Sequence, residues 1–564
     1  MVGLLSACGS SGGSNNNPAV TVSPATANVQ EGAKQQVSAT VTNSSNMAVN
    51  WEVNGVMGGN STVGTIDSTG LYTAPLVIPN PASVTITAVL QANSGVSGNA
   101  IATITAVTFN NASLKGNYVF TLSGIDVNGF RFYAVGTIIS DGNGNITGGE
   151  EDLNDVSSGY FKANSVTGTY SVGSDGRGLL NLNSSIGSFA YAFAMQALSN
   201  ASLNEIDNNV VNAVGNLEQQ AAGVAAPSGN YAFGFNGSGL GCGTFYSIGV
   251  FNLGSGTVGG TQDLNCGGNI SQNQLLQGSY TGVDGLGRGT GSFSASSGTS
   301  NFVYYVVSAS RYRYICPDVA TFFLGSADLQ TQQTFTGTNF NGNYVLNDSA
   351  NTQAGVSYTL IQLNAASGNI STGFYDVNDT GVVGKSSLTG AYQLTPNGRI
   401  SGSFTVSGST LPFSMYLISP TQAYYLDMRT NAVGGGNVYA QASAVTTNAA
   451  WAGSYSTKQF GYFIVNGAVL PGNSSSISGQ ISADGNGNLA GTLDINDPNN
   501  VYTGLNMQGT YSVGSVAPGR ATAAMTNSAE GTRNYIVYIV DPTRVLLLEV
   551  DSNLVSSGDT IRQF

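Results

Sequence analysis

Short runs of alternating apolar and polar residues recur along most of this chain. Phe189, Tyr191 and Phe193 stand at every second position, and so do Tyr118 and Phe120. A period of two is the signature of a β-strand with one buried face. No stretch of useful length shows the 3.6-residue period of a helix, so the pattern predicts an all-β protein.

Turn sequences separate these runs at short intervals. Asp-Gly-Asn-Gly occupies 141–144 and 484–487, and Gly-Ser-Asp-Gly occupies 173–176. These sequences favour tight hairpins, because Gly and Asn accept positive φ. A calcium loop at 141–152 is the alternative, but Ile146 stands where that loop needs Gly, and no flanking helix is predicted. The hairpin is therefore the favoured interpretation.

Four copies of one unit follow each other in the second part of the chain. Each copy carries, in order, Gly-x-Tyr, Asp-x-Asn, a second Gly-x-Tyr and a Gly-Arg pair; the opening glycines are Gly116, Gly229, Gly342 and Gly453. The copies are domain-sized, so we expect four homologous domains arranged like beads, with seven or eight strands each.

Sequential hairpins favour an antiparallel β-meander closed into an up-and-down barrel, because closure removes exposed strand edges. The order of the Gly-x-Tyr strands and the Asp-Gly hairpin resembles small avidin- or lipocalin-like barrels in architecture. That resemblance carries no ligand-binding signature with it. An open two-sheet sandwich is the alternative form of each copy.

Charged residues make up only 8% of the chain, yet every copy keeps one Asp in Asp-x-Asn and one Arg after Gly. A carboxylate and a guanidinium can form a bidentate contact that fixes the register of neighbouring strands, so we expect one structural ion pair in each domain. The expected pairs are Asp152–Arg177, Asp263–Arg288, Asp376–Arg399 and Asp494–Arg520. A polar ligand cluster at the barrel mouth is the alternative role of these residues.

The segment before the repeats carries several β-sandwich motifs. They are Val20-Thr-Val22-Ser-Pro24, the Glu31-Gly32 turn, Trp51-Glu-Val53-Asn-Gly55 and Gly70-Leu-Tyr72-Thr-Ala-Pro75. With these motifs, residues 18–107 resemble the bacterial Ig-like family of the group-2 type. The resemblance implies a small sandwich with Trp51 in its core, from a family found in surface adhesins and as a spacer. We expect a spacer here.

The first residues contain Leu5-Ser6-Ala7-Cys8, which resembles a bacterial lipobox. The resemblance implies cleavage of a signal peptide and lipidation of Cys8. The Gly/Ser/Asn-rich tract that follows suits a flexible tether. We therefore expect an outer-membrane lipoprotein of the cell envelope that faces the surface or the periplasm.

The expected organisation follows from these motifs. The boundaries are 1–17 for lipobox and tether, 18–107 for the bacterial Ig-like domain, and 112–220, 226–333, 338–443 and 449–564 for the four β repeats.

The chain contains no His, which excludes a Ser-His-Asp triad and every imidazole metal site. Hydrolysis by paired carboxylates needs no His, so Glu150, Glu151 and Asp152 are candidates for it. However, only Asp152 recurs in the other copies, and a solvated turn is the favoured interpretation. No catalytic residue, cofactor or metal is indicated.

Three cysteines lie in the second repeat. We expect Cys242 and Cys266 to be able to bridge neighbouring strands in an oxidising envelope compartment, which leaves Cys316 without a disulfide partner. No Cys-x-x-Cys occurs, so neither a zinc site nor a redox motif is indicated. The net charge of −13 argues against nucleic acid as a partner.

These observations favour a non-catalytic adhesion or interaction protein, anchored to the membrane through Cys8, that displays tandem β domains to a surface or extracellular partner. A glycan is one candidate partner. Two alternatives remain: small-molecule or glycan binding inside the barrel-like repeats, and a His-independent carboxylate hydrolase. Filled barrel interiors would favour the first function, and an open interior the second.

Overall fold

The structure is a computed structural model. It describes residues 17–126, 128–197, 200–207, 211–239, 241–318, 320–443, 445–514 and 517–563. The chain separates into two compact units, one that ends at Val107 and one that runs from Thr108 to Gln563. Regular structure in the described residues consists of strands and three short 3₁₀ helices. None of these helices is long and apolar enough to cross a membrane.

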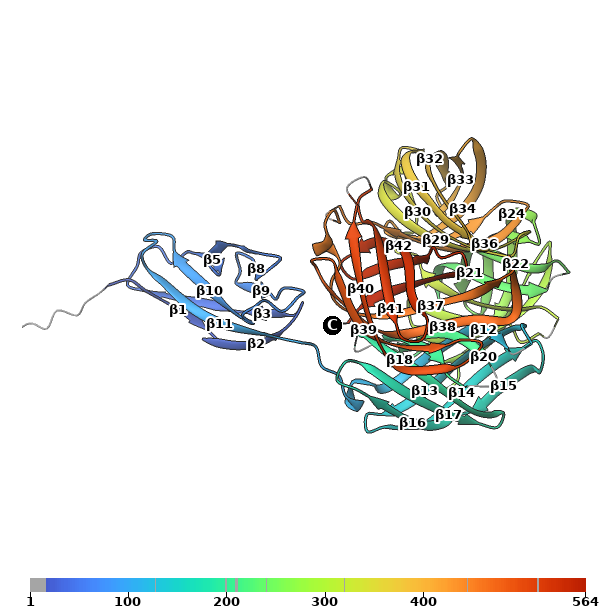
Figure 1. Ribbon diagram of the computed structural model, residues 1–564, viewed down its shortest axis with the longest axis horizontal. Helices are drawn as coiled ribbons and strands as arrows, with labels where there is room; N and C mark the ends of the chain where they lie inside the picture. The colour runs from blue at the N-terminus through green and yellow to red at the C-terminus, as the bar shows by residue number, and fades with distance from the viewer. Residues whose placement is uncertain are drawn as a thin grey trace, which may run out of the picture. The chain divides into compact units, whose positions relative to one another are not determined.

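The N-terminal unit contains three small sheets, with strand orders β1-β4, β2-β11-β10-β5-β6 and β3-β9-β8-β7 (Figure 1). The strands are β1 (Ala19–Ser23), β2 (Thr26–Gln30), β3 (Lys34–Gln36), β4 (Ser38–Thr42), β5 (Val49–Val53), β6 (Val56–Met57), β7 (Gly59–Asn60), β8 (Gly64–Ile66), β9 (Leu71–Thr73), β10 (Ser83–Leu90) and β11 (Ser97–Thr105).

Alternation places the core of this unit. In β10, Val84, Ile86, Ala88 and Leu90 are buried, and they pack in one cluster with Trp51 of β5. Trp51 is thus a core residue, as its motif led us to expect. The assignment of the unit to the bacterial Ig-like family stays a prediction.

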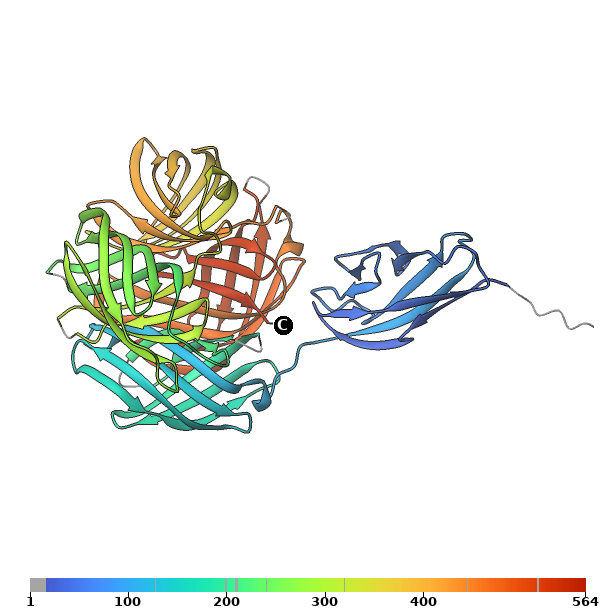
Figure 2. The ribbon, with the colours of Figure 1, turned by 180° about the vertical axis from the view of Figure 1, so that it is seen from behind.

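Each of the four repeats folds into a closed antiparallel barrel of eight strands in which consecutive strands are neighbours (Figures 1 and 2). We call them barrels 1 to 4 in chain order. In barrel 1, β15 and β16 both pair with β14 and together take the place of one strand. The all-β prediction and the closed-barrel form are confirmed, and the open sandwich is not observed in the four described repeats.

The element bounds of the barrels are as follows. Barrel 1 comprises η1 (Asn111–Ser113), β12 (Lys115–Asp126), β13 (Arg131–Asp141), β14 (Asn145–Asp155), β15 (Gly159–Ser165), β16 (Thr167–Val172), β17 (Arg177–Ser184), β18 (Gly187–Ala197), β19 (Asn200–Glu205) and β20 (Val211–Gln219). Barrel 2 comprises β21 (Gly229–Gly239), β22 (Gly243–Gly254), β23 (Thr257–Cys266), β24 (Asn269–Tyr280), β25 (Arg288–Ala295), β26 (Gly298–Ser308), β27 (Arg311–Ile315) and β28 (Phe322–Leu329).

Barrel 3 comprises η2 (Gly337–Asn339), β29 (Gly342–Thr352), β30 (Val356–Ala366), β31 (Asn369–Asp379), β32 (Val382–Leu394), β33 (Arg399–Val406), β34 (Ser409–Ser419), β35 (Gln422–Asp427) and β36 (Ala432–Ala440). Barrel 4 comprises η3 (Asn448–Ala450), β37 (Ala452–Val465), β38 (Ala468–Asp484), β39 (Asn488–Asn496), β40 (Val501–Val513), β41 (Arg520–Asn527), β42 (Gly531–Asp541), β43 (Arg544–Glu549) and β44 (Leu554–Arg562).

The backbone explains why each repeat opens with Gly-x-Tyr. The φ angles of the four opening glycines are +123° at Gly116, +125° at Gly229, +124° at Gly342 and +115° at Gly453. An L side chain is strained in this region, so glycine is required there. The tyrosine two positions later is buried in every copy. The motif therefore marks a backbone kink followed by a packed strand start.

Side chains fill the barrel interiors. In barrel 2, the ring centroid of Phe233 lies 4.7 Å from that of Phe235 and 4.1 Å from that of Phe251. Barrels 3 and 4 contain comparable clusters of buried aromatic and aliphatic residues. The cavity inside barrel 2 measures only 20 Å³, about the room that one water molecule needs. This cavity leaves no room for a larger ligand in barrel 2.

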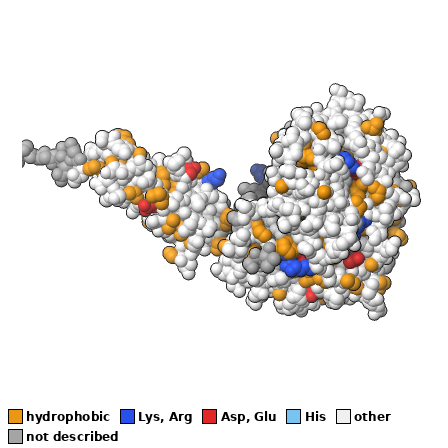
Figure 3. All heavy atoms as spheres, turned by 90° about the horizontal axis from the view of Figure 1, so that it is seen from above, with side chains coloured by type: hydrophobic (Ala, Val, Ile, Leu, Met, Phe, Trp, Pro, Cys, Tyr) orange, Lys and Arg blue, Asp and Glu red, His pale blue; other side chains and the backbone are white. Residues whose placement is uncertain are grey.

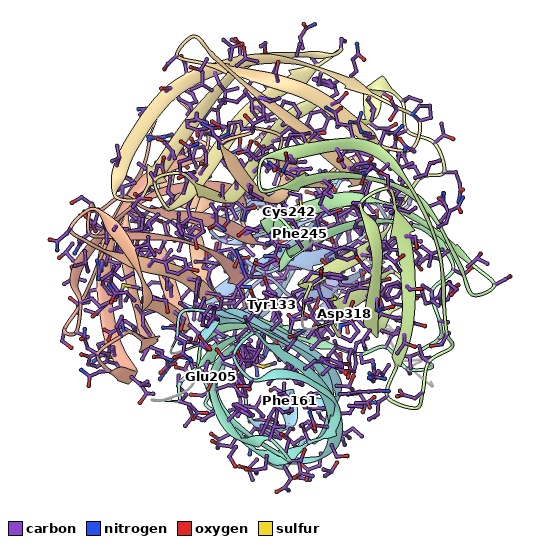
Figure 4. The ribbon with its side chains drawn as sticks, turned by 90° about the vertical axis from the view of Figure 1, so that its right-hand side faces the viewer. Tyr133, Phe161, Glu205, Cys242, Phe245 and Asp318 are labelled. Atoms are coloured by element: carbon purple, nitrogen blue, oxygen red, sulfur yellow. A yellow bond between two sulfur atoms is a disulfide. The ribbon has the colours of Figure 1, made fainter. Side chains whose placement is uncertain are left out.

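The four barrels form one compact unit and surround a common centre, as Figure 4 shows. The expected arrangement like beads is therefore wrong. The barrels pack together because their outer faces are also apolar. In β13, for instance, successive residues are buried on both faces of the strand. Tyr133 and Val135 of β13, for example, pack against Val303 and Tyr305 of barrel 2. We call this assembly of barrels 1 to 4 the ring.

Candidate functional site

The repeated Asp and Arg form ion pairs, but each pair joins two neighbouring barrels. Arg288 at the start of β25 donates from Nε to Asp152 Oδ2 at 2.6 Å and from Nη2 to Asp152 Oδ1 at 3.0 Å. The expected pairing of Asp152 with Arg177 inside barrel 1 is wrong, as are the three equivalent pairings. Asp152 lies on the outer face of its strand, so the next barrel supplies the guanidinium.

The same shift by one barrel holds around the whole ring. The remaining pairs are Arg399–Asp263 at 2.7 Å, Arg520–Asp376 at 2.6 Å and Arg177–Asp494 at 3.3 Å. The last pair joins barrel 1 to barrel 4, so the series of contacts closes on itself. The eight residues that the sequence singled out are thus the joints between barrels.

The Asn of each Asp-x-Asn also reaches into the next barrel. Asn265 Nδ2 donates to the carbonyl oxygens of Asp427 and Ala432, both at 2.8 Å. Asn154, Asn378 and Asn496 make equivalent contacts with main-chain carbonyls of barrels 2, 4 and 1. These amides satisfy carbonyls at a strand end that would otherwise be buried without a partner.

A repeated glutamine forms a further joint that the sequence analysis missed. Gln220 follows the last strand of barrel 1, and its Nε2 donates to the carbonyls of Leu286 at 2.9 Å and Val306 at 2.8 Å in barrel 2. Equivalent pairs of hydrogen bonds are made by Gln330, Gln441 and Gln563. Extending the alignment of the repeats past their last strand would have revealed this residue.

Buried tyrosines complete two of the ion pairs. Tyr305 donates its hydroxyl to Asp152 Oδ2 at 2.6 Å, and Tyr538 donates to Asp376 Oδ2 at 2.5 Å. Burial, then the charge of Asp376, raises the pKa of Tyr538 well above its ordinary value. The hydrogen bond to Asp376 is the main cause that raises the pKa of Arg520. Each of these two carboxylates thus accepts hydrogen bonds from both a guanidinium and a tyrosine of the next barrel.

The interface that closes the ring has a different chemistry. It brings together small hydroxyl side chains, with Ser202 Oγ of barrel 1 lying 2.8 Å from Ser456 Oγ of barrel 4. Asn204 Nδ2 donates to the carbonyls of Ser476 at 3.3 Å and Asp494 at 3.1 Å. By contrast, the joint between barrels 2 and 3 buries a cluster of apolar side chains that includes Ile248 of barrel 2.

A polar cavity lies where the four barrels meet; we call it the axial cavity. Its volume is 250 Å³ and every barrel contributes to its wall. The lining residues are Gln196, Asn200, Asn216, Glu218, Arg311, Arg313, Ser326, Asp328, Gln422, Tyr424, Asn437, Tyr439, Lys458, Arg544, Asp559 and Ile561. A second cavity of 200 Å³ shares Asn216, Arg313, Ser326, Tyr424 and Asn437 with it.

Charged side chains concentrate in the axial cavity. Seven of its sixteen lining residues are charged, whereas charged residues are 8% of the chain. The outer face in Figure 3 is mostly uncharged, with few and scattered charges. Because an ion in a recess costs more desolvation than one at the outer surface, this concentration calls for partners or a role.

Most of these charges are paired. Arg311 contacts Asp328 at 2.6 Å and Glu218 at 3.1 Å, and Arg313 shares Glu218 at 2.5 Å. On the other side of the cavity, Arg544 Nη1 contacts Asp559 at 3.1 Å. The guanidinium of Arg544 also lies over the ring of Tyr439, 4.5 Å from its centroid, in a cation–π contact.

Lys458 lies outside these four ion pairs. Its Nζ donates to Asn216 Oδ1 at 2.8 Å. Burial lowers the pKa of Lys458, and Asp559 opposes this shift. An ammonium group has three donors, so this side chain can offer further hydrogen bonds to the cavity.

The remaining residues that the sequence singled out have structural positions. Cys8 lies outside the described residues. Cys242 and Cys266 form a disulfide with their Cα atoms 5.5 Å apart, and Cys316 is a buried free thiol. Asp141 accepts hydrogen bonds from the backbone N–H of Asn143 and Asn145 in the turn between β13 and β14.

The three consecutive carboxylates lie within β14, so the solvated-turn interpretation is wrong. Asp152 belongs to the joint with barrel 2, and Glu151 on the opposite face is 1% exposed. Burial raises the pKa of Glu151 to about 7. Within the described residues, no group of three His, Cys, Asp or Glu side chains could hold a metal ion.

Comparisons with known proteins identify no family for the chain. No family model matches it, and no curated protein matches it. A solved mutant of transferrin binding protein B from Haemophilus parasuis aligns with 10% identity over 64% of this chain and 83% of that chain, with a TM-score of 0.18. The N-terminal eight Ig domains of Down syndrome cell adhesion molecule align with 9% identity over 85% and 100% of the two chains, with a TM-score of 0.12. TM-scores this low carry no argument about function.

Proposed function

We propose that this protein is a lipid-anchored component of the bacterial cell envelope whose ring presents a rigid, non-catalytic binding surface. In this proposal, lipidated Cys8 holds the chain at the outer membrane. The N-terminal unit, as a bacterial Ig-like domain, serves as the spacer. The ring then meets a surface or extracellular partner, for which a glycan is one candidate.

The observation that carries this proposal is the closed series of joints around the ring. Ion pairs, amide contacts and apolar clusters hold each barrel against the next. Such a preorganised surface loses little conformational entropy when it binds. The four repeats would therefore act together as one surface, and not as four independently tethered modules.

The filled barrel interiors support the same proposal. Barrels 2, 3 and 4 pack their own aromatic and aliphatic side chains inside. Ligand capture inside these barrels is thus disfavoured. Recognition would take place on the outer faces and in the recesses between barrels.

The positions of the carboxylates disfavour hydrolysis. A glycosidase needs two carboxyl groups that face one scissile bond. Asp152 is held by Arg288 in the joint with barrel 2, and neighbouring residues of a strand point to opposite faces. Glu151 and Asp152 therefore do not converge on one substrate. Glu150 shares a strand face with Asp152, but Arg288 already binds both carboxylate oxygens of Asp152.

Lipid labelling of cells tests the anchor. We expect radiolabelled palmitate to enter the full-length protein and the Cys316→Ser control, but not Cys8→Ser. We also expect Cys8→Ser to leave the membrane fraction. Equal labelling of Cys8→Ser and the wild type would contradict the anchor.

Limited proteolysis of the purified chain tests the rigid ring. We expect the four barrels to persist together as one large fragment, because each barrel is held by two neighbours. Early release of fragments the size of one barrel would contradict a single rigid surface.

A further inference from the structure

The same hairpin of each barrel builds most of the axial cavity, and Gln196 of β18 and Lys458 of β37 complete its wall. The paired residues at its wall are Asn200 with Glu218, Arg311 with Asp328, Gln422 with Tyr439, and Arg544 with Ile561. These pairs hold equivalent places in the last two strands of barrels 1 to 4. The cavity thus has a fourfold scaffold and four different sets of side chains.

The joints behave differently from the cavity. At the joints, all four barrels use the same residue types, with Asp, Asn, Arg and Gln each repeated four times. Side chains that only hold equivalent barrels together can be the same in every copy. Most cavity residues vary between copies, although Arg311 and Arg544 are equivalent arginines and Asn216 and Asn437 are equivalent asparagines. The recess therefore lacks fourfold symmetry, which suits one oriented ligand.

The charge balance of the cavity favours an anion. Four cationic and three anionic side chains line it, which leaves one positive charge in excess. Each carboxylate has an arginine in an ion pair, which leaves Lys458 as the excess cation. Lys458 lies across the strand pair from Asp559, and its Nζ donates a hydrogen bond to the neutral Asn216. The whole protein carries −13, so this recess is opposite in sign to the molecule.

The rest of the wall is suited to hydroxyl groups. Side-chain amides of Asn200, Gln422 and Asn437 face the cavity beside Tyr424. Amides both donate and accept hydrogen bonds, as hydroxyl groups do, so the two match well. Solvent reaches the site, since the side chains of Arg311 and Arg544 are 36% and 30% exposed.

We propose that the axial cavity binds a small hydroxylated monocarboxylate of the uronic-acid type, with its carboxylate on Lys458 and its hydroxyl groups on the surrounding amides. The axial cavity measures 250 Å³ and shares five lining residues with the cavity of 200 Å³, so a small ligand has room there. This site goes beyond the proposed function, because its ligand is a small molecule and its binding needs no anchor or macromolecular partner.

Isothermal titration calorimetry on the purified full chain tests the proposal. The probes are sodium glucuronate, glucose, acetate and inorganic phosphate. We expect glucuronate to bind with one site per chain and at least tenfold more tightly than any of the other three. Glucose lacks the carboxylate, whereas acetate and phosphate lack the ring hydroxyls.

Two variants locate the site. We expect Lys458→Gln to weaken glucuronate binding tenfold or more, whereas Lys385→Gln, at an exposed position of β32, leaves it unchanged. Gln422→Ala removes a wall amide outside the ion pairs, and should weaken glucuronate severalfold. Thermal unfolding shows whether Lys458→Gln folds. If it does not, Gln422→Ala still tests the site.

Three results would overturn the proposal. They are no glucuronate binding by the wild type, glucose or phosphate binding as tight as glucuronate binding, and unchanged glucuronate affinity in folded variants of the cavity. The last result would move any uronic-acid site elsewhere on the molecule.

Discussion

Arg177 and Asp494 are 317 positions apart in the sequence, and their contact at 3.3 Å closes the ring. This joint is the weakest of the four ion pairs in geometry. Arg177 is 23% exposed, whereas Arg288 in the equivalent joint is 9% exposed. Burial raises the pKa of Asp494 despite the nearby Arg177. Ala194 also stands across from Arg177, where Tyr305 stands across from Arg288.

Removing the arginine should therefore destabilise the fold more at the joint between barrels 1 and 2 than at the joint between barrels 4 and 1. Arg288→Met leaves Asp152 buried without its counter-ion, and we expect the free energy of unfolding to fall by about 3–5 kcal/mol. We expect Arg177→Met to cost less than half of that, because Asp494 can take up a proton more readily. Urea denaturation of both variants measures the difference. Equal losses would show that the closing joint is as strong as the others.

Truncating the repeated glutamine should destabilise the ring through the carbonyls it leaves unpaired. Gln220→Ala removes two hydrogen bonds to buried carbonyls, and we expect a loss of about 1–3 kcal/mol. The neighbouring Gln219 is exposed, so Gln219→Ala is the matched control with an expected change within about 0.5 kcal/mol. Equal unfolding midpoints for the two variants would contradict this role of Gln220.

Stability should depend on pH through the buried carboxyl of Glu151. Burial is the main cause that raises its pKa from 4.5 to about 7, so the folded chain holds a proton that the unfolded chain releases. Stability then falls as the pH rises through this window. The free energy of unfolding should fall less with rising pH in Glu151→Gln than in the wild type, by on the order of 2 kcal/mol. Unfolding of both chains near pH 5 and pH 8 measures it, and identical pH profiles would contradict the prediction.

The disulfide should stabilise barrel 2, because it restricts the conformations that the unfolded chain can adopt. Cys242 and Cys266 are 24 positions apart, and we expect the double variant to Ser to lose about 3 kcal/mol. Reduction of the wild type should give the same loss, and a reductant should not affect the variant further. Alkylation of Cys242 or Cys266 in denaturant without reductant would show that the bridge is absent.

The strands and the four repeats were predictable because they depend on local physics. Period-two alternation, hairpin turns and glycines with positive φ act over a few residues, and the sequence displays them directly. The Asp and Arg that recur in each copy could also be singled out, since charge is scarce. Their partners could not be assigned, because the two faces of a strand look alike in sequence when both are buried, as in β13.

The axial cavity could not be predicted from the sequence at all. Its charged residues come from three barrels that are distant in the chain, and none of them repeats in all four copies. Lys458 and Asn216, for instance, are 242 positions apart. The sequence by itself therefore determined the barrels, whose contacts are between consecutive strands. Only the tertiary structure decided which outer faces meet, because that choice depends on the shape and polarity of whole barrel surfaces.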